Sequence, residues 1–207
     1  MPSALETATR AIRREDLQYM VVPVEDLPPV LAGFGEGRHG ELDNETMAAQ
    51  GFPGSTTETV AATGRIAGYL REFVTPLNAG LDLPDLDLMA ATVVHLFEDS
   101  EQVARWMRDK FLGEFKEFVG QELGKGQKLV RADELKVEGY SDEAVGLHTS
   151  QMTESGLVSS TVVDLRVGRL LGVAYVVTTG EVVRMDTVAE MGLTLERRIV
   201  QVVLGAI

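Results

Sequence analysis

The sequence contains no cysteine, which excludes disulfide bonds, thiolate metal ligands and cysteine nucleophiles. It also lacks any apolar run close to the roughly twenty residues of a membrane-spanning helix, so no membrane span is expected. Basic residues are outnumbered, 19 against 32 acidic ones, and a net charge of -13 disfavours nucleic acid and anionic lipid surfaces as partners. The chain has 207 residues and is 44% hydrophobic, which is sufficient for a folded globular protein.

The clearest pattern lies in the last fifty residues, 157–207. Apolar and polar residues alternate around Val163 and Leu165, as in a strand with one buried face. Gly168 and Arg169 fit a two-residue hairpin turn, and the fully apolar run 170–177 then predicts a buried central strand. From Thr187 onward, apolar residues recur at helical spacing, which predicts a long amphipathic helix.

Similar patterns predict the earlier elements. Asp99 is placed to cap a second long amphipathic helix that continues to about Val119. Strands are predicted at 18–24, 64–74, 88–97, 129–138 and 144–152, and a short helix at 3–15.

Strands outnumber helices and are joined by short turns, so the fold class expected is α+β, with a mostly antiparallel sheet and the two long amphipathic helices packed on it. The whole chain, 1–207, is expected to form one domain. The spacing in Gly64–Gly68 is similar to that in Gly168–Gly172, and each half runs from a buried strand into a capped helix. This predicts two pseudo-repeated halves, 1–122 and 127–207.

Residues 33–58 are rich in glycine and polar side chains and predict a long, functional or mobile loop with a short helix at 44–50. Residues 35–40 match G-x-G-x-x-G, but two prolines precede the motif and acidic residues flank it, so no dinucleotide or other cofactor is expected. An enzyme with its acid–base residues in this loop remains an alternative. The candidates would be Glu36, His39, Asp43 and Glu45.

Four residues are the candidates for ligand binding: Phe34, Arg38 and His39 in the loop, and Trp106, which lies off the main apolar stripe of its helix. The other two histidines, His95 and His148, are predicted on separate strands. They could share a metal ion only if those strands were neighbours, and they have no metal-binding spacing, so no metal is expected.

Three segments carry a resemblance to a known group of proteins. They are Asp26-Leu27-Pro28 followed by Gly33-Phe34, Gly64-Arg65-Ile66-x-Gly68-Tyr69, and Ser100-Glu101-Gln102-Val103-Ala104. In this layout the chain resembles uncharacterised exported proteins and lipoproteins of bacteria, similar to secreted α+β domains of the PsbP/LpqN or kinase-sensor type. The resemblance implies an extracytoplasmic location, although no signal peptide or lipidation cysteine is visible. It carries no catalytic motif.

The function expected is therefore a non-enzymatic extracytoplasmic domain that binds a small ligand or a partner protein of unknown specificity. The enzyme described above is one alternative. A structural module that forms a homodimer through an exposed edge strand is another.

Overall fold

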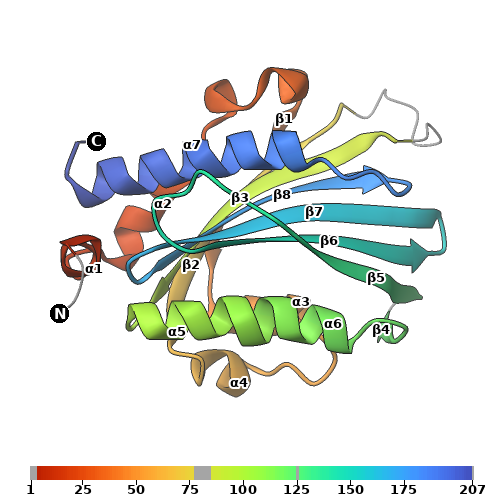
Figure 1. Cartoon of the computed structure of the whole chain (residues 1–207), viewed down its shortest axis with the longest axis horizontal. Helices are drawn as coiled ribbons and strands as arrows, with labels where there is room; N and C mark the ends of the chain where they lie inside the picture. Colours follow the sequence, from red (N-terminus) through yellow and green to blue (C-terminus); the bar gives the residue numbers. More distant parts are fainter. Residues whose placement is uncertain (1–3, 77–84, 125, 207) are drawn as a thin grey trace.

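The computed structural model describes residues 4–76, 85–124 and 126–206, and its described parts form one eight-stranded antiparallel sheet with helices on both faces (Figure 1). The strands lie in the order β1-β2-β3-β8-β7-β6-β5-β4, and each pairs antiparallel with its neighbour. Their bounds are β1 Gly35–Leu42, β2 Arg65–Val74, β3 Asp87–Phe97, β4 Glu122–Gly124, β5 Gln127–Leu135, β6 Ala144–Thr153, β7 Gly156–Val167 and β8 Leu170–Thr179.

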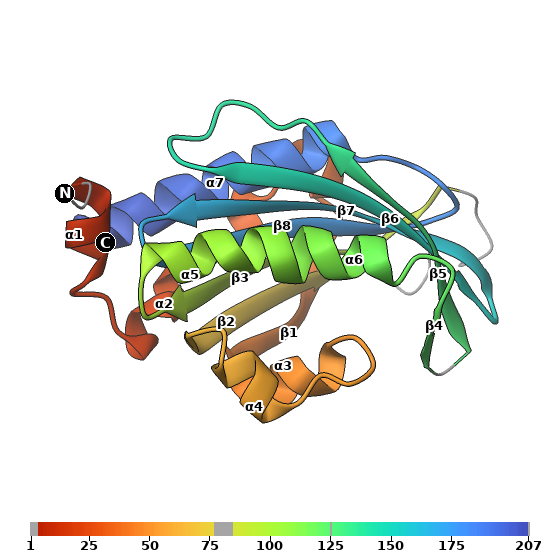
Figure 2. The same cartoon turned by 60° about the horizontal axis from the view of Figure 1, so that its bottom comes forward.

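The helical segments divide between the two faces of this sheet (Figures 1 and 2). On one face lie α7 and the N-terminal segments; on the other, a continuous helix of three parts and the pair α3 and α4. Their bounds are α1 Ala4–Thr9, η1 Arg14–Asp16, α2 Leu17–Met20, η2 Val24–Asp26, η3 Pro29–Leu31, α3 Asn44–Gln50, α4 Thr57–Ala61, α5 Ser100–Arg105, η4 Trp106–Gly113, α6 Glu114–Glu117 and α7 Met185–Val203.

The face under α7 holds most of the core. Leu195 and Ile199 of α7 pack on Leu165 of β7 and Leu170 of β8, all four almost fully buried. Further along α7, Met191 packs against the same face in a second cluster. Burial of such side chains contributes roughly 1.5–3 kcal/mol each, so α7 is the main source of stability on this face.

The opposite face, which we call the pocket face, carries smaller clusters. Val103 and Met107 of the continuous helix pack on Phe97 and Leu171 of the sheet. Met47 of α3 packs against a third group of apolar residues, which belong to strands β1, β2 and β3. Because the helix and α3 cover different strands of the pocket face, the two coverings leave a space between them.

The expectation of an α+β fold with an antiparallel sheet is confirmed. The hairpin at Gly168 and Arg169 also forms, with Val167 paired to Leu170 across it. The two long helices lie on opposite faces of one continuous sheet, and the predicted pseudo-repeat of two halves is not confirmed. The last helix begins at Met185, two residues before the Thr187 capping box that was expected to open it.

Two local predictions were wrong. Residues 17–20 form the helix α2, where a strand was expected over 18–24, because Leu17 and Met20 are both directed into the α7 face at helical spacing. Residues 35–42 form strand β1, where a loop was expected. This strand is polar and glycine-rich because it lies at the edge of the sheet, where only one side pairs and most side chains reach solvent.

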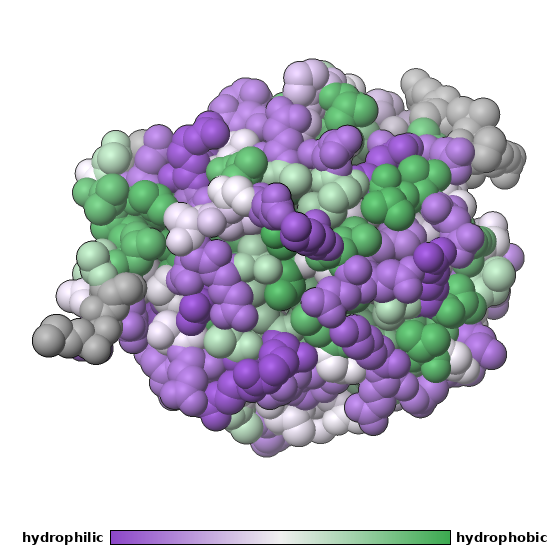
Figure 3. All heavy atoms as spheres, in the orientation of Figure 1, coloured by the Kyte–Doolittle hydropathy of each residue, from purple (hydrophilic) through white to green (hydrophobic). Residues whose placement is uncertain are grey.

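Both edges of the sheet have features that hinder pairing with another chain. β1 carries Glu36, Arg38 and Glu41 and has an irregular register between Glu36 and His39, and β4 is only three residues long. Charges, bulges and short strands are the usual protection of sheet edges. On the molecular face seen in Figure 3, hydrophobic residues form separate patches among mostly hydrophilic ones.

Candidate functional site

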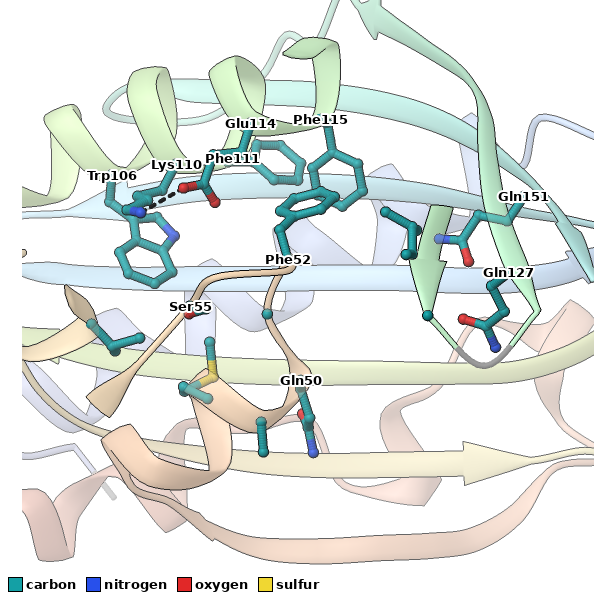
Figure 4. A pocket seen from close by; sticks show the side chains of 16 residues that line it. Gln50, Phe52, Ser55, Trp106, Lys110, Phe111, Glu114, Phe115, Gln127 and Gln151 are labelled. Carbon is teal, nitrogen blue, oxygen red and sulfur yellow. Dashed lines mark hydrogen bonds and ion pairs between the residues drawn. The ribbon is translucent and has the colours of Figure 1, made fainter. Parts of the chain in front are cut away.

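A pocket of about 610 Å³ opens on the pocket face, between the continuous helix and the segment that contains α3 and α4 (Figure 4). One wall comes from Trp106, Phe111 and Phe115 of the helix. The facing wall comes from residues 47–60, and the far end is closed by β4, β5 and β6. A volume of this size is typical of small-molecule sites, and all three walls come from regular elements or the short connections between them.

Most of the lining is apolar and aromatic. The set consists of Met47, Ala49, Phe52, Val60, Trp106, Phe111, Phe115 and Leu123. Trp106 rests edge-on against Phe97 of the sheet, with ring centroids 5.6 Å apart, and this contact fixes the orientation of the indole in the pocket wall. Large aromatic side chains of this kind provide most of the contact area in ligand pockets.

Phe52 connects the two walls. Its ring stacks on Phe118, with centroids 4.6 Å apart, and meets the edge of Phe115 at 4.8 Å. It lies on the short connection between α3 and α4, next to Gly51 and close to Gly54, whose φ of +93° suits glycine. All three phenylalanine rings are half-buried, so this aromatic contact joins the walls at a place where solvent can reach it.

The polar lining residues are three glutamines, Ser55 and one ion pair. Gln127 and Gln151 lie together at the end of the pocket formed by the strands, opposite Trp106 (Figure 4). Gln50 lies on the facing wall, and none of the three carboxamides has a hydrogen-bond partner among the described residues. The charged lining residues, Lys110 and Glu114, bind each other. The pocket thus offers free donors and acceptors without an unpaired charge.

The helix that forms the upper wall is π-helical over Trp106–Gly113. π-Helical segments are rare and often occur at functional sites. A π turn contains more residues than an α turn, so Trp106 and Phe111, which are five residues apart, can both line the pocket.

A buried polar cluster lies beside the pocket. The guanidinium of Arg65 donates from Nε to His95 Nδ1 at 3.1 Å, from Nη1 to Asn44 Oδ1 at 2.6 Å and from Nη2 to the Leu42 carbonyl at 2.7 Å. Burial lowers the pKa of Arg65 to about 10. Burial, with the Arg65 charge as a second cause, holds the pKa of His95 well below its usual range, so the imidazole is neutral and accepts at Nδ1.

Asp164 is a second buried ionisable group on the same face. It is opposite Val145 of β6 and Val173 of β8, and both valines pack in the cluster beneath Trp106 and Met107. Its carboxylate has no hydrogen bond or ion pair among the described residues, and burial raises its pKa well above the usual value. The group is therefore held as a neutral acid over a wider pH range than an exposed aspartate.

Of the four residues proposed from the sequence for ligand binding, the structure brings only Trp106 to the pocket. Phe34 packs beside the core under α7. Arg38 forms an ion pair with Glu72 of the neighbouring strand, and His39 is exposed on β1.

The alternative acid–base residues do not form a connected group in the described structure. Glu36 and His39 are exposed on β1, and Glu45 is exposed in the first turn of α3. Asp43 caps the same helix, and its Oδ1 accepts from the Thr46 backbone N–H at 2.7 Å. This hydrogen bond is the main cause of the lowered pKa of Asp43.

The sheet topology rules out a metal site shared by His95 and His148. β8 and β7 separate the strands of His95 and His148, and the two side chains lie on opposite faces of the sheet. Within residues 4–76, 85–124 and 126–206, no group of three metal-ligating side chains is found.

Sequence reasoning missed most of the pocket. Phe111 and Phe115 belong to the predicted amphipathic helix without any sign of a binding role, and Phe52, Gln127 and Gln151 carry no recognisable signal. With the continuous helix counted as one, the lining residues come from seven separate elements and connections, and only the folded chain brings them together. Trp106 was identifiable because it departs from the apolar stripe of its helix.

Among the described residues, no helix is both long and apolar enough to cross a membrane. No protein-family model matches the sequence, and no curated protein does. A solved structure with a similar fold is the extracellular domain of PknH from Mycobacterium tuberculosis, with a TM-score of 0.60 and 11% identity over 92% of this chain and 97% of that chain. At this identity the likeness concerns the fold alone, and at that level it agrees with the kinase-sensor layout that the sequence resembles.

Proposed function

We propose that this chain is a non-enzymatic, extracytoplasmic binding domain that takes a small ligand into the pocket between the continuous helix and α3–α4. The observation that carries the proposal is the aromatic pocket of about 610 Å³, whose two walls meet through the half-buried ring of Phe52. The similar fold of an extracellular domain supports the location outside the cytoplasm.

The arrangement of the walls supports reversible binding. At one end, the two walls are joined through the backbone, where Glu98 N–H donates to the Gly64 carbonyl at 3.0 Å. At the other, the walls meet through the ring contacts of Phe52. A ligand can enter there when Phe52 swings away, at the cost of two aromatic contacts worth about 0.5–1.5 kcal/mol each.

The test is titration with N-phenyl-1-naphthylamine, an uncharged dye that becomes fluorescent in apolar sites. We expect saturable binding of one dye per chain. The variant Leu123→Glu places a charge in the pocket lining and is expected to weaken dye binding at least tenfold, because a charge in an apolar site is costly to desolvate.

The matched control is Leu193→Glu, which changes an equally half-buried leucine on α7, outside this pocket. It should leave dye affinity within about twofold of the wild type. Equal loss in both variants, or no saturable binding to the wild type, would contradict the proposed function.

Location is tested separately in the source cells. Antibody detection of the chain after protease treatment of intact and of lysed cells should show digestion in both, if the domain lies outside the cytoplasmic membrane. Protection in intact cells whose outer layers are permeable to the protease would contradict that part of the proposal.

A further inference from the structure

We infer that the pocket selects an uncharged ligand with an apolar body and a hydrogen-bonding head, such as an amide. This inference rests on the proposed function and names the ligand class of the same site. It depends on how charge and hydrogen-bonding groups are distributed along the lining.

The apolar body is expected beside Trp106. This end combines the indole with Phe111, which is only 8% exposed, and with Val60, which is 5% exposed. An apolar or aromatic ligand group gains most at this end, because contact with these side chains removes its surface from water.

The polar head is expected beside Gln127 and Gln151, at the opposite end (Figure 4). Gln127 is exposed and Gln151 half-buried, and neither side chain has a hydrogen-bond partner among the described residues. A carboxamide presents donors on its nitrogen and an acceptor on its oxygen. The partner that matches both is another amide or a hydroxyl group.

Charged heads are disfavoured for two reasons. The charged side chains of the lining, Lys110 and Glu114, neutralise each other, so a ligand charge would lose hydration without gaining an ion pair. The chain as a whole carries a net charge of -13, which further repels anions.

Three probes of one shape test this selection: 6-phenylhexanamide, 6-phenylhexanoate and 6-phenylhexylammonium. The chain has a single tryptophan, and it lines the pocket, so quenching of its fluorescence reports binding of each probe. We expect the amide to bind at least about fivefold more tightly than either charged probe. This difference in affinity corresponds to the free energy of roughly one net hydrogen bond.

Variants at the polar end assign the preference to the glutamines. Gln127→Leu combined with Gln151→Leu should bring the three affinities to within about twofold. Gln151→Glu should make the ammonium the tightest probe, because it supplies the missing counter-charge. Gln201→Leu, on α7, is the control and should keep the wild-type order.

A wild-type preference for either charged probe, equal affinity for all three, or no binding of the amide would overturn the inference. So would an amide preference that survives loss of both glutamines. The dye titration separates this failure from that of the proposed function. If the dye binds in the pocket and the amide is not preferred, only the ligand class is wrong.

Discussion

Phe52, which lines the pocket, stacks on Phe118, with ring centroids 4.6 Å apart and planes inclined by 22°. The two residues come from opposite walls, one from the connection between α3 and α4 and the other from the end of the continuous helix. This contact, together with the edge of Phe115, holds the walls together where no strand pairing does so. Phe52 is therefore the side chain that joins the two walls at this place.

Phe52→Ala should speed release of bound N-phenyl-1-naphthylamine at least about threefold, because loss of a closing contact acts mainly on the dissociation rate. The free energy of unfolding should fall by less than about 2 kcal/mol, since the ring is half-buried. Stopped-flow dilution of the dye complex measures the rate, and urea denaturation measures the stability.

Phe34→Ala is the matched control for Phe52. Phe34 is also half-buried, but it packs beside the core under α7, away from the pocket. It should lower stability and leave the release rate of the dye unchanged. Equal release rates for Phe52→Ala and the wild type would show that Phe52 does not close the pocket.

Arg65→Met should destabilise the fold by about 2–4 kcal/mol, because it leaves His95, Asn44 and the Leu42 carbonyl without their donor in a buried place. Arg71→Met, on the same strand, is the control. The side chain of Arg71 has no hydrogen bond among the described residues, and its loss should cost less than about 1 kcal/mol. Similar unfolding midpoints in urea for the two variants would argue against the Arg65 cluster as a stabilising element.

Gly68→Ala should lower the free energy of unfolding by roughly 1–3 kcal/mol. A methyl group at this position would come within 2.4 Å of Arg65 Nη2 and 2.6 Å of His95 Nδ1, so the buried pair would have to move. Gly35→Ala, at a position with nothing within 4 Å, should be nearly neutral. The thermal unfolding midpoints of the two variants test this role of Gly68. Equal midpoints would contradict it.

Asp164→Val should remove a pH-dependent part of the stability. Burial raises the pKa of Asp164 in the folded state, so the folded chain holds this proton above the unfolded pKa of about 3.9. The contribution of Asp164 to the stability of the wild type is therefore largest below that pH. It falls by up to about 1.4 kcal/mol per pH unit as the pH rises toward the pKa of the folded state.

Urea denaturation of both proteins between about pH 4 and 8 measures this effect. The buried His95 changes stability in the opposite direction below about pH 6.5, because its pKa is lowered in the folded state. Its contribution cancels in the difference between wild type and variant. A difference that does not grow with pH would contradict the account of Asp164.

Much of the fold was predictable because the buried strands have a strong local pattern. The run 170–177 is apolar on both faces because β8 lies centrally in the sheet and is covered by helices on both sides. Asp99 was correctly identified as a helix cap, and its Oδ1 accepts from the Gln102 backbone N–H at 2.8 Å. In these segments local propensity and tertiary environment agree.

The misassigned segments are those where the tertiary environment outweighs local pattern. β1 contains three glycines and several charges, and pairing with β2 is what makes it a strand. The pocket was mostly unpredictable for a related reason. Phe52 and Gln151 are far apart in the sequence, and neither belongs to a motif whose spacing would reveal that they line the same site.

Energy transfer from Trp106 to bound N-phenyl-1-naphthylamine tests the central claim most directly, since this residue is the single tryptophan and lies in the pocket wall. If the dye occupies the pocket, tryptophan emission should fall as dye emission rises, with one midpoint and one dye per chain. Saturable dye binding that leaves the emission of Trp106 unchanged would place the dye elsewhere and contradict the assignment of this pocket as the binding site.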